Sequence, residues 1–179
     1  MTKRALQQLR YPIGDMPAPL SFSESDITNW VNDIEKLPAK LRTAVQNLTI
    51  EQLDTPYRPE GWTVRQVVHH VSDSHLNAFA RLKLALTEEN PTIKPYEEQF
   101  WAELTDSKMP IEPSLRIIEN MHLKMVNILR ELSATELDRT FFHPGSKKTF
   151  KVGTLAAMYA WHGLHHLAHI ENLAKREKW

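Results

Sequence analysis

The protein has 179 residues, the size of one domain with a substantial hydrophobic core. Its 22 basic and 22 acidic side chains give a formal net charge of zero without a basic run, which argues against binding to nucleic acid or to an acidic membrane surface. The absence of cysteine excludes disulfides, thiolate ligands and a cysteine nucleophile. Any metal bound by side chains must therefore have nitrogen or oxygen ligands.

The composition and the N-terminal residues set the expected fold class and location. The first residues lack the apolar segment of a signal peptide, and no apolar run is long enough to span a bilayer, so we expect a cytoplasmic protein. Few glycines and long stretches of helical periodicity predict an all-α fold. Prolines recur within residues 1–22, which predicts an irregular N-terminal arm, and residues 23–179 then form a single helical domain.

The first half of the domain has the pattern of two long helices. One begins near Ser23, whose hydroxyl can cap it, and its apolar residues recur at helical spacing. Pro38 should break or kink this helix, after which a second segment continues to Leu48. A capping box that starts at Thr63 predicts the next long helix, which extends to about Leu86.

The second half has two further long helices. Residues 88–113 are rich in loop-forming residues, with a short helix expected at 96–104. The third long helix starts near Pro113 and ends by Leu132. Residues 139–152 fit either a small hairpin or an extended connection, and a last helix covers residues 154–173.

Two short segments resemble each other. Residues 48–54 read Leu-Thr-Ile-Glu-Gln-Leu-Asp and residues 132–138 read Leu-Ser-Ala-Thr-Glu-Leu-Asp. Each follows a predicted helix, has capping-box spacing and leads to a helix that bears histidines. The similarity indicates two helix–turn–helix halves related by a pseudo-repeat, although short capping boxes also arise by chance.

The last helix holds four of the nine histidines. His162, His166 and His169 fall within roughly 60° of one another on a helical wheel and share their face with apolar residues. Residues four apart are neighbours on a helix, so His162 and His166 can bind one ion from the same side. His165 and His169 form a rival pair with the same spacing. Hydrogen-bonded core histidines are the alternative, but one divalent ion can satisfy two imidazoles together, so the pattern favours a metal site.

The helix that starts after Thr63 offers candidates for a third ligand. On its wheel, His70 borders the apolar arc on a polar stripe, whereas His69 lies further from the arc and should face solvent. His75 lies within the arc, more than about 120° from His70, and cannot easily share an ion with it. A polar stripe beside a core face is typical of a cavity wall, but also of an exposed helix flank, so these residues alone leave the third ligand open.

These motifs resemble a known family. The stretch Trp-Thr-Val-Arg-Gln-Val-Val-His-His-Val-Ser-Asp at 62–73, followed by His-x-x-His-His at 162–166, is similar to the DinB-like superfamily and most similar to its YfiT branch. The resemblance implies a four-helix bundle with pseudo-twofold halves, commonly a homodimer, in a group of metal-dependent hydrolases that includes bacillithiol S-transferases. It also implies that the metal ligands are His70, His162 and His166.

A three-histidine site implies an enzyme with an exchangeable ligand position. We expect zinc or nickel, with manganese or iron as alternatives, activating water for hydrolysis or a thiol for S-transfer to a small-molecule substrate. For S-transfer, the resemblance implies bacillithiol as the co-substrate. Asp73 is expected to orient an imidazole and Tyr159 to donate a proton or hydrogen bond. Metal affinity should fall as the pH falls through about 6. The alternative is a metal-stabilised bundle that binds a ligand or partner without turnover.

Overall fold

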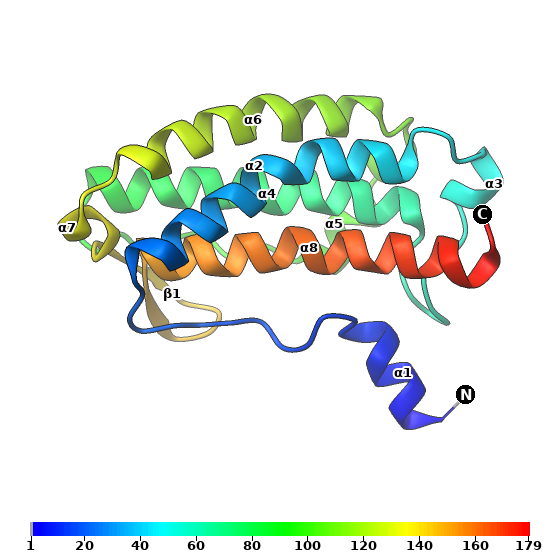
Figure 1. Ribbon diagram of the computed structural model, residues 1–179, viewed down its shortest axis with the longest axis horizontal. Coiled ribbons are helices and arrows are strands. Elements are labelled where there is room, and N and C mark those ends of the chain that lie inside the picture. Colours follow the sequence, from blue (N-terminus) through cyan, green and yellow to red (C-terminus); the bar gives the residue numbers. More distant parts are fainter. Residues whose placement is uncertain (1) are drawn as a thin grey trace.

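Four amphipathic segments form the long helices of the protein, whose computed structural model describes residues 2–179 (Figure 1). The helices are α2 (Glu24–Val45), α4 (Val64–Thr87), α6 (Glu112–Glu131) and α8 (Val152–Glu177). They form a four-helix bundle, and the only strands in the described part of the chain belong to one small hairpin. The predicted fold class is therefore confirmed. None of the described helices combines the length and the apolar character needed to cross a membrane.

The order of the helices in space differs from their order in the chain. Both α2 and α4 pack against α6 and α8, so the consecutive helices α2 and α4 lie across the bundle from each other. The colours of Figure 1 show that the chain runs one way along α2 and α8 and the opposite way along α4 and α6. Helices α4 and α8 are neighbours, and His70 of α4 lies near His162 and His166 of α8 at their interface.

The two similar heptapeptides have the same structure. They form α3 (Ile50–Leu53) and α7 (Ala134–Leu137), which are single helical turns that begin with a complete capping box. Each of these turns follows one long helix and precedes a long helix that bears histidines. The two turns lie at opposite ends of the bundle in Figure 1. The expected pseudo-repeat therefore corresponds to two equivalent halves, α2–α3–α4 and α6–α7–α8.

The remaining elements are short. Residues 88–111 contain α5 (Glu98–Trp101) and the 3-10 helix η1 (Thr105–Lys108), within the predicted loop region. Strands β1 (Thr140–His143) and β2 (Lys148–Lys151) pair antiparallel, with Phe141 opposite Phe150. Of the two conformations that the sequence allowed for residues 139–152, the hairpin is the one observed.

The N-terminal arm is not wholly irregular, so that part of the prediction is wrong. Helix α1 (Lys3–Arg10) begins at Thr2, whose side chain accepts a hydrogen bond from the amide of Ala5. The prolines of the arm all follow Arg10, which is why they leave this helix intact. Beyond α1, Thr154 donates a hydrogen bond of 2.6 Å to the carbonyl of Pro19, which fixes the arm against the start of α8.

Pro38 does not break its helix, so that part of the expectation from sequence is wrong. Helix α2 continues through this buried proline to Val45. A proline has no N–H, so the carbonyl of Ile34, one turn earlier, loses its usual helical donor. The imidazole of His122 on α6 replaces that donor, with 2.6 Å between its Nδ1 and the Ile34 oxygen. This tertiary hydrogen bond satisfies the carbonyl that the proline leaves free.

Candidate metal centre

Three imidazoles meet between α4 and α8. His70 comes from α4, and His162 and His166 come from successive turns of α8. Each offers a ring nitrogen that lies within 4.8 Å of the other two, and the Nε2 atoms of His70 and His162 are 3.2 Å apart. Two nitrogens bound tetrahedrally to zinc at about 2.0–2.1 Å are themselves about 3.3 Å apart. The arrangement therefore fits a divalent ion held by these three residues, the set that the resemblance implied.

Burial keeps these imidazoles neutral. The pKa of His70 is lowered to about 4, first by loss of hydration and then by the nearby His165. Burial also lowers the pKa of His162 and of His166 well below the usual value, and the neighbouring imidazoles add to the effect. At neutral pH each ring therefore has a free lone pair, which is the form that binds a metal.

These lowered pKa values mean that metal affinity should fall at a lower pH than the value of about 6 expected from sequence. A proton competes with the ion only near the pKa of the folded, metal-free site, so we expect the affinity for zinc to be nearly constant from pH 7 to about 5. It should then fall as the pH approaches 4. The measurement is a competition titration with a zinc indicator across this range, with the fold checked by circular dichroism. An affinity that already falls tenfold per unit around pH 6 would show that the imidazoles titrate like exposed histidines.

A second layer of histidines lies behind His162. The Nδ1 of His162 is 3.2 Å from the Nε2 of His75, and the Nδ1 of His75 is 2.9 Å from the Nε2 of His122. His75 and His122 are buried, in α4 and α6 respectively. As the helical wheel indicated, His75 is not in the three-histidine group. Sequence reasoning missed its pairing with His122, although two imidazoles on apolar helix faces both need a buried partner.

The rival histidines form an overlapping group. His165, His166 and His169 also place ring nitrogens within 4.8 Å of one another. The Nδ1 of His169 is 3.4 Å from the Nδ1 of His166, and its Nε2 is 3.2 Å from the carbonyl oxygen of Arg10 at the end of α1. His166 thus belongs to both groups, and its Nδ1 is the atom near His169.

His69 does not face solvent, so that prediction is wrong. Its side chain is buried, with Nδ1 2.8 Å from the hydroxyl of Ser114 and Nε2 3.1 Å from the carbonyl of Met109. The polypeptide that enters α6 covers this face of α4. A helical wheel built from α4 alone contains no information about that covering segment.

The two predicted catalytic residues differ in their surroundings. Tyr159 is buried beside the site, where its ring contacts those of His75 and His162 and its hydroxyl accepts a hydrogen bond of 3.3 Å from Arg81. The carboxylate of Asp73 has no hydrogen bond to an imidazole within residues 2–179. Burial and the nearby Asp106 raise its pKa to about 6. The expectation that Asp73 orients an imidazole therefore remains a prediction from sequence.

The three imidazoles line a cavity of about 470 Å³ that is rich in cationic side chains. Arg10, Arg58 and Arg81 contribute to its wall, and within residues 2–179 none of them forms an ion pair with a carboxylate. Glu98 is the one acidic residue in the lining. Arg10 and Arg58 belong to the arm and to the loop before α4, and no sequence pattern indicated that they would meet Arg81 at the histidines.

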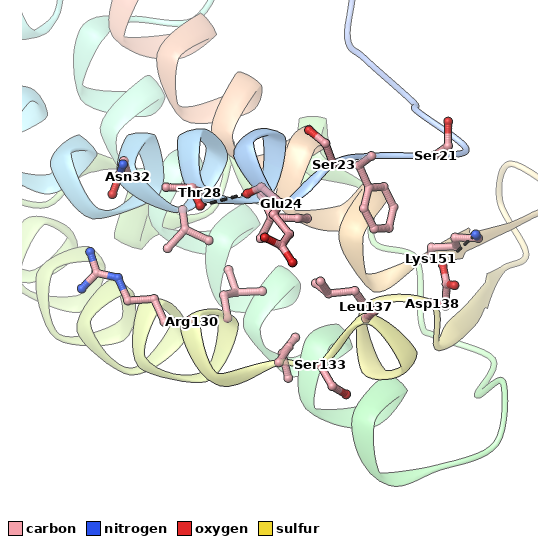
Figure 2. Close-up of a pocket in the computed structure, with 16 residues that line it drawn as sticks. Ser21, Ser23, Glu24, Thr28, Asn32, Arg130, Ser133, Leu137, Asp138 and Lys151 are labelled. Carbon is pink, nitrogen blue, oxygen red and sulfur yellow. Dashed lines mark hydrogen bonds and ion pairs between the residues drawn. The ribbon is translucent and has the colours of Figure 1, made fainter.

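A larger cavity, of about 820 Å³, lies elsewhere and has a different character. Figure 2 shows it between the start of α2, the end of α6 and α7, with Glu24 and Thr28 on one side and Ser133 and Leu137 on the other. No histidine lines it, and the nearby charges of Asp138 and Lys151 pair with each other at 2.7 Å. Its size therefore does not make it a competing metal centre.

Comparison with known proteins shows which family the chain belongs to. Residues 33–170 match the DinB superfamily. The chain belongs to this superfamily. A protein of Bacillus cereus strain AH820 and one of Bacillus anthracis strain CDC 684, both named "Putative metal-dependent hydrolase", are each 52% identical to this superfamily member over 174 residues, which is 97% of this chain and 100% of theirs.

A solved structure supports the same assignment. It is that of YfiT from Bacillus subtilis, described as "a probable metal-dependent hydrolase with an unusual four-helix bundle topology". The match has a TM-score of 0.94 and 44% sequence identity, and it covers 96% of this chain and 99% of YfiT. The predicted resemblance to the YfiT branch of the superfamily is confirmed.

Proposed function

We propose that this DinB superfamily member is an enzyme in which a divalent ion held by His70, His162 and His166 activates a nucleophile. The observation that carries the proposal is the convergence of three neutral imidazoles on one cavity wall. Structural zinc sites usually have four protein ligands, often cysteines, and this chain has no cysteine. Such an ion lowers the pKa of water towards neutrality, polarises a carbonyl or holds a thiol as thiolate. Imidazole ligands favour zinc or nickel, with manganese or iron as alternatives.

The rest of the cavity indicates what kind of molecule the enzyme binds. Three guanidinium groups that pair with no carboxylate of residues 2–179 favour a small molecule that carries an acidic group, because guanidinium binds carboxylates and phosphates in a bidentate manner. Tyr159 accepts a hydrogen bond from Arg81, so its own hydroxyl proton can point to the substrate. This lining supports either hydrolysis of an anionic substrate or transfer of an anionic thiol of the bacillithiol type.

An exchangeable ligand position is the testable feature of this proposal. Adding azide or a small thiol to the cobalt-substituted protein should shift the visible absorption bands of the ion, because three protein ligands leave a position for exogenous molecules. His70→Ala, prepared in the same way, is the control for cobalt bound elsewhere. A spectrum that neither ligand changes would contradict the enzyme proposal and would leave a metal-stabilised bundle that binds a ligand or partner without turnover.

The same preparation separates the two reactions. Loss of a haloaromatic electrophile only when thiol is present would identify S-transfer, whereas ester or amide cleavage without thiol would identify hydrolysis. Arg58→Gln should raise the KM for an anionic thiol more than that for an uncharged thiol.

The cytoplasmic location and the homodimer remain predictions from sequence.

A further inference from the structure

A row of three imidazoles connects the metal centre to the backbone of α2. It consists of the hydrogen bonds His162–His75, of 3.2 Å, and His75–His122, of 2.9 Å, and ends at the carbonyl of Ile34, 2.6 Å from His122. No carboxylate within residues 2–179 bonds to these rings. Because an unpaired charge in the core is costly, all three are neutral, and each has one N–H and one nitrogen lone pair.

The direction of every hydrogen bond in the row is fixed from its far end. A carbonyl oxygen only accepts, so the Nδ1 of His122 must carry hydrogen and its Nε2 must carry the lone pair. His75 must then donate from Nδ1 to His122, which leaves the lone pair of His75 on Nε2. His162 must in turn donate from Nδ1 to His75. The lone pair of His162 is thereby placed on Nε2, the atom that lies 3.2 Å from the Nε2 of His70.

We propose that His75 and His122 are positioning residues that hold His162 in the tautomer and ring orientation required for metal binding. The Ile34 carbonyl is available to end the row because Pro38 supplies no amide hydrogen to it. This proposal rests on the role of His162 as a ligand in the function proposed above. A carbonyl cannot take up a proton in neutral water, so the row orients a ligand and does not conduct protons out of the site.

The second histidine group, His165, His166 and His169, is better explained as orienting His166 than as binding a second ion. Arg10 is the last residue of α1, so its carbonyl has no helical donor and accepts from the Nε2 of His169. The Nδ1 of His169 then has the lone pair and faces the Nδ1 of His166 at 3.4 Å, which leaves the lone pair of His166 on Nε2. A second ion would need a lone pair on the Nδ1 of His166 as well, and a neutral imidazole has only one.

The tautomers can be observed directly, without metal or activity. In ¹⁵N NMR spectra of metal-free protein with labelled imidazoles, His162 should show hydrogen on Nδ1 and a lone pair on Nε2. Assignment would use the spectrum of His162→Gln. Hydrogen on the Nε2 of His162 would overturn the proposal. Because this spectrum needs no ion, it tests the hydrogen-bonded row separately from metal binding. A protein that bound no metal but showed this tautomer would contradict the proposed function and leave the row itself in place.

Paired substitutions test whether the row matters for binding. In His75→Gln the side-chain oxygen can still accept from His162, whereas His75→Phe fills the same space without an acceptor. We expect His75→Phe to lose the fixed tautomer and to bind zinc about 10–100-fold more weakly, while His75→Gln stays close to the wild type. His122→Phe and His122→Gln should repeat the contrast in weaker form, although residue 122 contacts no ligand histidine. Equal zinc affinity in the Phe and Gln variants would overturn the proposal.

Discussion

Replacing His166 with alanine should abolish stoichiometric metal binding, whereas replacing His165 with alanine should leave it intact. His166 supplies one of only three imidazoles in the group shared with His70. Loss of a direct ligand should weaken binding by more than the roughly 10–100-fold that an outer hydrogen-bond partner contributes. The measurement is elemental analysis of each variant after loading with zinc and desalting, followed by calorimetric titration of the variants that retain metal.

The two positions form a matched pair. Both lie in α8, both side chains are buried, and both belong to the second histidine group with His169. Truncation therefore removes similar packing, and comparable thermal melts in the absence of metal would show that the fold tolerates each change. If His165→Ala lost the ion and His166→Ala kept it, the centre would have to be the group that includes His165 and His169.

Removing the metal should lower the melting temperature by roughly 5–11 °C. At a free-ion concentration 100 times the Kd, binding stabilises the folded state by about 2.7 kcal/mol. In a chain of this length, each kcal/mol corresponds to roughly 2–4 °C. The melting temperature falls, and does not rise, because the ion binds only the folded protein: the site is assembled from α4 and α8, which come together only in the folded bundle.

The measurement is a thermal melt of the zinc-loaded protein before and after dialysis against a chelator. His166→Ala provides the control, since a variant that binds no ion should melt at the same temperature with and without chelator. Restoring zinc to the dialysed wild type should restore its original melting temperature. A wild-type melting temperature that does not respond to chelator would indicate that hydrogen bonds alone satisfy the histidines.

The components of the site that were predicted from sequence are those that depend on local spacing. His162 and His166 are four residues apart in a helix, so helical geometry alone places them together. His70 was one of several candidates until the resemblance to the DinB-like superfamily selected it, and the distance of 3.2 Å between its Nε2 and that of His162 agrees with that selection. The cationic cavity was missed because Arg10, Arg58 and Arg81 come from three separate segments.

Pro38 illustrates how a local rule fails. The rule that proline interrupts a helix counts one lost hydrogen bond and an unsatisfied carbonyl. In this protein His122, 88 positions after Ile34, donates to that carbonyl, so α2 continues. The same contact begins the row of imidazoles that reaches the metal centre. No pattern within residues 23–48 could have indicated it.

The sequence by itself determined the capped starts of α2 and α4, the paired capping boxes and the His162–His166 pair, because each depends on residues within one or two turns of one another. The tertiary structure alone decided that His69 is buried, that His75 meets His122 and that α1 reaches His169. Those outcomes depend on which helix faces are apposed. Apposition is set by the packing of the whole bundle, and a helical wheel describes one helix without its neighbours.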